Sequence, residues 1–187
     1  IGGFFTSVNG ETHNHIARLN SDGTIDGTFD TGTGAGNNVW TIQVQSDDKI
    51  VVGGFFTSFD GQTHNRICRL NADGSLDNTF DAGVGPDANV FKTVIQDDEK
   101  IIIGGFFENL NGQSQNRVAR LNADGTQDVS FNVGTGASAS VRALLLQDDG
   151  KLLVGGFFGT FNGSAHGGIV RLNNDGSTDN TFISGSG

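Results

Sequence analysis

The chain has 187 residues and a formal net charge of −10, with 21 acidic and 11 basic side chains. This balance argues against binding to nucleic acid or to an anionic membrane surface, because both depend on lysine and arginine to neutralise negative charge. The 30 glycines and single proline suit an all-β fold with many tight turns, and no apolar stretch approaches the roughly 20 residues that a membrane span needs.

One pattern of residues recurs four times at a constant spacing of 51 residues. Its landmarks are a Gly-Gly pair, an Arg-Leu-Asn run, an Asp-Gly pair and a phenylalanine. A fixed period of this size predicts repeated units whose neighbours share a core. Because residue 1 falls within a strand of the pattern, we expect the sequence to be part of a longer chain. The predicted domain is a single propeller over 1–187, with repeats 1–38 (partial, lacking its first strand), 39–89, 90–140 and 141–187.

The second repeat shows the elements of one unit in order. Its β-branched and aromatic residues predict strands. Asp47-Asp48 separates the first two strands, and Asp60-Gly61 predicts a two-residue hairpin turn in which both residues have positive φ. Asp73-Gly74 precedes a short last strand. The four predicted strands cover 39–45, 49–57, 65–70 and 76–80.

Four antiparallel strands followed by a link to the next copy are the construction of a propeller blade. The sequence therefore predicts an all-β fold, a β-propeller built from 51-residue, four-stranded antiparallel blades. A β-solenoid is the rival architecture, but its coils are usually shorter and lack three hairpins per repeat.

The runs that start at Gly53 and at Arg66 resemble the delta-60 β-propeller repeat. The hallmarks of that family are Gly-Gly-x-Phe-Thr, Asn-Gly, Arg-Leu-Asn-x-Asp-Gly-x-x-Asp and Gln-x-Asp-Gly-Lys. This chain departs at Asp60, at Asp98-Glu99 and at Gly167-Gly168. The resemblance implies a large bacterial or phage-encoded surface or secreted protein, and it implies no shared catalytic residues.

The Arg-Leu-Asn-x-Asp-Gly-x-x-Asp element supplies charged residues that recur in every repeat. A catalytic arginine is not needed four times, so we predict one structural ion pair per blade. The paired columns are Arg18, Arg69, Arg120 and Arg171 with Asp26, Asp77, Asp128 and Asp179. No cofactor is expected, although Asn71, Asp73 and Asp77 supply closely spaced oxygens and leave calcium as an alternative.

The turns after the second strand and the links between repeats lie together on one face of a propeller, and these segments vary most between the copies. Loops on a rigid scaffold commonly carry function, and amide and imidazole groups suit a carbohydrate or a protein epitope. Trp40 is expected to pack in the core, with ligand stacking as the alternative. The candidate ligand-binding residues are His13, His64, Gln115, His166, Asn37, Asn38, Asn89 and Trp40.

No Ser-His-Asp set, Cys-His pair or phosphate-binding loop stands out, so an enzyme such as a propeller hydrolase or lyase is not expected. The expected function is a structural or interaction scaffold in adhesion or display, with a carbohydrate-binding propeller module as the alternative. The expected partners are a protein or glycan on a surface and the rest of the chain itself, and a homo-oligomer is compatible with the sequence. The expected location is the outside of a bacterium, its cell surface or a phage virion.

Overall fold

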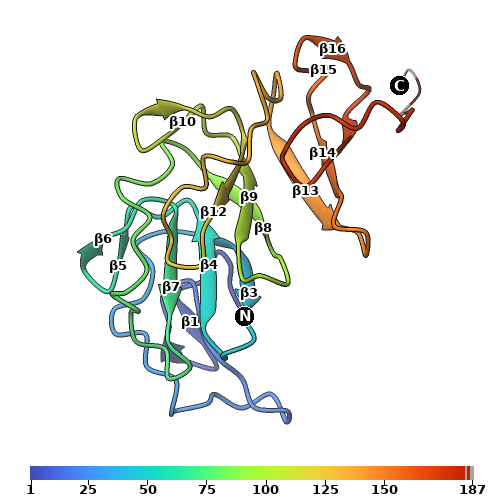
Figure 1. Cartoon of the computed structure of the whole chain (residues 1–187). Helices are drawn as coiled ribbons and strands as arrows, with labels where there is room; N and C mark the ends of the chain where they lie inside the picture. The colour runs from blue at the N-terminus through green and yellow to red at the C-terminus, as the bar shows by residue number, and fades with distance from the viewer. Residues whose placement is uncertain (184, 186–187) are drawn as a thin grey trace.

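The computed structural model describes residues 1–183 and 185, which form strands and turns but no helix (Figure 1). No segment of this part of the chain is therefore a helix that could cross a membrane. Three repeats each build an antiparallel three-stranded sheet, in which the second strand lies in the middle. The three sheets consist of β3 (Val39–Val44), β4 (Ile50–Gly54) and β7 (Ile67–Leu70); β8 (Val90–Ile95), β9 (Ile101–Gly105) and β12 (Val118–Leu121); and β13 (Val141–Leu146), β14 (Leu152–Gly156) and β17 (Ile169–Leu172).

Each repeat also forms a separate two-stranded hairpin. In the second repeat the chain leaves the sheet after Gly54, so the strand predicted over 49–57 is shorter than expected, and residues 55–57 connect β4 to the hairpin. Asp60 and Gly61, with φ of 45° and 70°, form the hairpin turn, as the sequence predicted. The hairpins pair β1 (Ser7–Val8) with β2 (Glu11–Thr12), β5 (Ser58–Phe59) with β6 (Gln62–Thr63), β10 (Asn109–Leu110) with β11 (Gln113–Ser114), and β15 (Thr160–Phe161) with β16 (Ser164–Ala165).

The fourth strand of each blade, predicted over 76–80 in the second repeat, is reduced to a single bridge between Leu70 and Leu76. The chain turns directly afterwards, because a carboxylate oxygen of Asp77 accepts hydrogen bonds from both the main chain and the hydroxyl of Thr79. Such a local side-chain turn competes with continued strand pairing. The prediction of a four-stranded blade is therefore corrected to three strands and a bridge.

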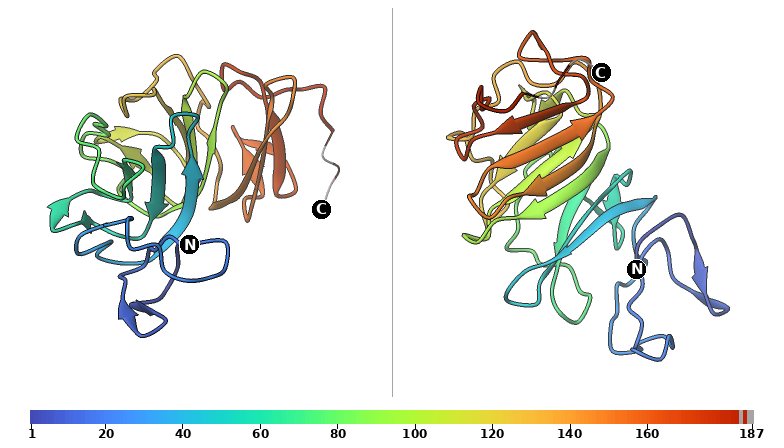
Figure 2. Two further views of the ribbon diagram at one scale, coloured as in Figure 1. Left: turned by 90° about the horizontal axis from the view of Figure 1, so that it is seen from below. Right: turned by 90° about the vertical axis from the view of Figure 1, so that its right-hand side faces the viewer.

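The hydrophobic core lies between neighbouring repeats. Ile16 and Phe29 of the first repeat pack in one cluster with Val52, Phe56 and Cys68 of the second. The first strands of successive sheets are neighbours, β3 beside β8 and β8 beside β13 (Figure 2). Sheets that share their cores in this way, with their first strands adjacent, are arranged as propeller blades are.

Candidate functional site

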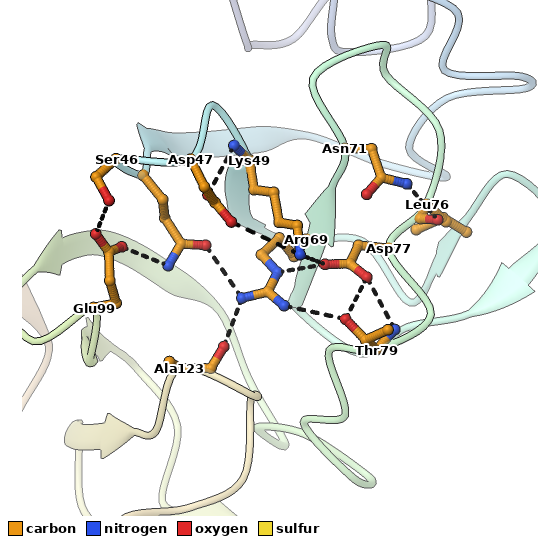
Figure 3. A network of polar contacts seen from close by, with 11 residues as sticks. Ser46, Asp47, Lys49, Arg69, Asn71, Leu76, Asp77, Thr79, Glu99 and Ala123 are labelled. Carbon is orange, nitrogen blue, oxygen red and sulfur yellow. Dashed lines mark hydrogen bonds and ion pairs between the residues drawn. The ribbon is translucent and has the colours of Figure 1, made fainter.

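The predicted ion pair is present once in every repeat. In the second repeat, Arg69 Nε donates to Asp77 Oδ2 at 2.8 Å, and both side chains are buried (Figure 3). Lys49 Nζ lies 3.1 Å from the same oxygen. The equivalent pairs are Arg18–Asp26, Arg120–Asp128 and Arg171–Asp179.

The carboxylates of these pairs are held in the charged form. Burial by itself would raise the pKa of Asp77, but hydrogen bonds from Thr79, Lys49 and Arg69 outweigh it and hold that pKa well below its usual range. Hydrogen bonds from Thr28, joined by Arg18, lower the pKa of Asp26 to about 2. A carboxylate in this state is a poor proton donor or acceptor at neutral pH. The pairs therefore have a structural role.

Three of these arginines also join their repeat to the next one. Arg69 Nη1 donates to the carbonyl oxygen of Ala123, which belongs to the third repeat (Figure 3). Arg18 and Arg120 make the same bond, to Ala72 and to Asn174. The arginine column thus links neighbouring blades as well as closing a turn within its own.

The three residues of the calcium alternative are occupied by bonds to other protein groups. Asn71 donates to the hydroxyl of Ser75 at 3.0 Å, and Asp73 accepts from that hydroxyl and from the Ser75 main chain. Asp77 belongs to the arginine network (Figure 3). Among residues 1–183 and 185 no three or more His, Cys, Asp or Glu side chains gather closely enough to hold a metal ion.

The predicted histidine column lies on or beside the small hairpins. Burial lowers the pKa of His64, which lines a hollow together with Phe80, Asp81 and Ala82. The Gln115 amide donates to the carbonyl of Val118 at 2.8 Å. The remaining members of the column are His13, 4.0 Å from a Glu11 oxygen, and His166, which follows β16.

Trp40 is exposed, contrary to the expectation that it packs in the core. It retains 52% of its accessible surface. The pairing register of β3 and β4 shifts between Val39 and Thr41, so Trp40 is the additional residue of a β-bulge. A bulge redirects a side chain, and here it turns the indole away from the core. Phe91 and Arg142 occupy the same bulge position in the next two repeats.

A row of exposed phenylalanines lies close to these bulges, and the sequence reasoning did not identify it. In three of the four Phe-Phe pairs the second ring is core, as with Phe56 at 0% exposure, whereas the first, Phe55, is 42% exposed. Adjacent residues of extended chain point to opposite sides, so the pair itself was the available signal. The exposed rings of the other repeats are Phe4, Phe106 and Phe157.

Cations cover several of these rings. The guanidinium carbons of Arg66 and Arg117 lie 4.9 and 5.9 Å from the ring centroids of the exposed phenylalanines in their own repeats. The fourth repeat has Gly168 at this position, and Arg142 approaches Phe157 instead, at 5.5 Å. We call the surface formed by Trp40, Phe55, Phe91, Phe106, Arg142 and Phe157 the aromatic face.

The predicted asparagines lie at the aromatic face. The carbonyl oxygens of Asn38 and Asn89 accept hydrogen bonds from the amides of Phe55 and Phe106, each at 2.9 Å. Asn37 bonds to the Asn38 main chain through its side-chain oxygen. The side-chain oxygen of Asn38 is buried and has no donor within the described residues. Trp40, Asn38 and Asn89 are thus brought to the same surface, whereas the histidine column belongs to the hairpins.

Comparison with known proteins identifies the family to which this chain belongs. A family model described as a domain of unknown function (DUF5122) beta-propeller matches residues 1–29, 45–80, 96–131 and 147–182. A crystal structure of a protein of unknown function from Bacteroides caccae aligns over 87% of this chain and 72% of its own, with 14% identity and a TM-score of 0.36. No curated protein matches the chain. Since the four matched segments follow the 51-residue period and cover most of the sequence, the chain belongs to the DUF5122 β-propeller family.

Proposed function

We propose that this chain is a non-catalytic interaction scaffold that uses the aromatic face to hold a partner. The observation that carries the proposal is the exposure of Trp40 and Phe157, at 52% and 78%, on one surface of a molecule whose other rings largely fill its cores. Clustered exposed apolar side chains mark binding sites in soluble proteins. The recurring charged network is occupied by structural bonds and offers no free acid or base.

The setting that we propose is adhesion or display by a bacterial surface or secreted protein, or by a phage virion. The resemblance to delta-60 repeats supports this setting, and a regular array of blades suits the presentation of one surface to a partner.

A carbohydrate-binding module is the second candidate. The exposed indole and phenyl rings favour it, because a sugar presents C–H faces that stack against aromatic rings.

The test applies the fluorescently labelled chain to a glycan array and to bacterial and host cells. We expect binding to at least one of these, reduced about tenfold or more in the double variant Trp40→Ala, Phe157→Ala. The matched control is Val129→Ala, because Val129 is 85% exposed but lies outside the aromatic face. Binding that survives the double variant unchanged would refute the proposal. Cleavage of an array glycan by the chain would show an enzyme instead.

A further inference from the structure

Three residues at one position of successive repeats form a continuous row across the aromatic face. The rings of Trp40 and Phe91 meet edge to face with centroids 6.3 Å apart. The guanidinium carbon of Arg142 lies 3.7 Å from the Phe91 centroid, so the cation covers a face of that ring. Phe157 extends the row on the far side of Arg142. The order along the row is an exposed ring, a partly buried ring, a cation and another exposed ring.

Arg142 differs from the other arginines of this surface in its hydrogen bonds. Arg66 and Arg117 donate through their terminal nitrogens to main-chain carbonyl oxygens of their own repeats. Among residues 1–183 and 185, the hydrogen bond of Arg142 runs from Nε to the Ser140 hydroxyl at 3.4 Å. Both Nη groups are therefore without a protein acceptor there, on a side chain that is exposed.

The position of this cation is not required by the scaffold. The equivalent residues of the other repeats are aromatic, Trp40 and Phe91, and their blades have the same three strands and the same bulge. A planar guanidinium with free N–H groups matches a carboxylate in a bidentate geometry. Arg142 therefore adds to the row a preference for a negatively charged, planar group.

The rings beside Arg142 indicate the rest of the ligand. An aromatic ring carries negative charge on its face, which matches the polarised C–H bonds on one side of a pyranose. The bulge position contributes one member of the row in each of three successive repeats, which suits a ligand that itself repeats. We propose that the aromatic face binds a polysaccharide that contains uronic acids, with sugar rings against Trp40 and Phe157 and a carboxylate on Arg142. This inference rests on the proposed function and names its ligand class.

Calorimetric titration of the 187-residue chain tests the inference. The ligands are three polyuronates (polygalacturonate, alginate and hyaluronan) and fully methyl-esterified polygalacturonate, which keeps the sugar faces and removes the charge. We expect at least one polyuronate to bind, with the esterified polymer about tenfold weaker. Arg142→Gln should weaken binding of the acidic polymer about tenfold and leave the esterified polymer unaffected, whereas Trp40→Ala should weaken both.

Two controls distinguish binding at a specific site from nonspecific electrostatic attraction. Lys100→Gln removes the same charge at the other end of the blade, next to the start of β9, and should keep full affinity. Because Lys100 lies 3.0 Å from Asp128 of the ion-pair column, circular dichroism and the melting temperature of this variant are measured as well. Poly-L-glutamate should bind far more weakly than the polyuronate. Circular dichroism and the melting temperature of Arg142→Gln show whether the variant is folded, and Arg142→Lys repeats the test with the charge kept and the planar geometry removed.

The outcomes distinguish the two proposals. Equal affinity for the esterified polymer, with no effect of Arg142→Gln, would overturn the acidic specificity and leave the interaction scaffold standing. An equal loss in Lys100→Gln, or equal affinity for poly-L-glutamate, would show attraction between charges or an acidic peptide ligand instead. If none of the three polyuronates binds, the inference is overturned, and the array and cell experiment alone decides the proposed function.

Discussion

The side chain of Arg69 shows how one residue type supports both a turn and a contact between blades. Its Nε holds Asp77 within the blade, its Nη1 holds the carbonyl of Ala123 in the next, and its guanidinium carbon lies 4.9 Å from the centroid of the Phe80 ring. The ion pair was predictable from the sequence, because arginine and aspartate recur at a fixed separation in all four copies. The bond to Ala123 was not, since it depends on how two blades dock.

Replacement of Arg69 by alanine should lower the free energy of unfolding by about 3 kcal/mol, because it leaves a buried carboxylate with fewer partners and removes a link between blades. Arg18→Ala is the matched control. Its side chain is 37% exposed against 7% for Arg69, so a smaller loss is expected. Urea denaturation followed by tryptophan fluorescence and far-UV circular dichroism measures both values. An unchanged stability of the Arg69 variant would contradict a structural role for the column.

At the scale of the element, the sequence predicts the turns well and the strand ends poorly. Asp60-Gly61 forms a hairpin turn because local conformational preference decides it. The glycine at the end of β4, Gly54, depends instead on a distant group, since a side chain there would overlap the carbonyl oxygen of Asn38, which directly precedes β3. The exposure of Trp40 and Phe55 follows from the same crowded bulge, so it could not be predicted from alternation along a single strand.

Gly54→Ala should destabilise the chain by about 2 kcal/mol, because the added methyl group meets main-chain atoms that cannot rotate away. Gly3 occupies the same position in the first repeat, and its nearest neighbours are Phe5 ring atoms at 3.4 Å and beyond. We therefore expect Gly3→Ala to be nearly neutral. Thermal unfolding of the two variants provides the comparison, and similar melting temperatures would show that the approach to Asn38 does not determine the Gly-Gly pair.

At the scale of the whole molecule, the contacts that stabilise the fold lie at the boundaries between repeats. Phe29 of the first repeat and Val52 and Cys68 of the second share one cluster, and Thr41 and Thr93 join β3 to β8 through hydroxyl groups 2.9 Å apart and buried. The 51-residue period predicted this sharing, because a unit this small cannot bury its hydrophobic faces alone. Which side chains pair across the boundary depends on how the blades dock, so the period could not predict it.

Cys68 provides a probe of that boundary. The thiol is fully buried, and burial raises its pKa far above the usual range, so it should resist alkylation in the native protein. We expect labelling only after the first two repeats separate, at a rate that rises with denaturant. Cys68→Ala should have native-like stability, because Ala17 and Ala119 fill the column elsewhere, and it provides the unlabelled control. Rapid labelling without denaturant would show that this core opens easily.

The arginine bonds from Arg18 to Ala72, from Arg69 to Ala123 and from Arg120 to Asn174 all point from one blade to its successor. Tension applied between the two termini therefore loads these bonds in series. A pulled chain should yield in discrete steps, one blade at a time, each lengthening the polypeptide by roughly 170 Å for 51 residues. A tether of this construction dissipates load gradually while the blades that remain folded keep their aromatic surface available to a partner.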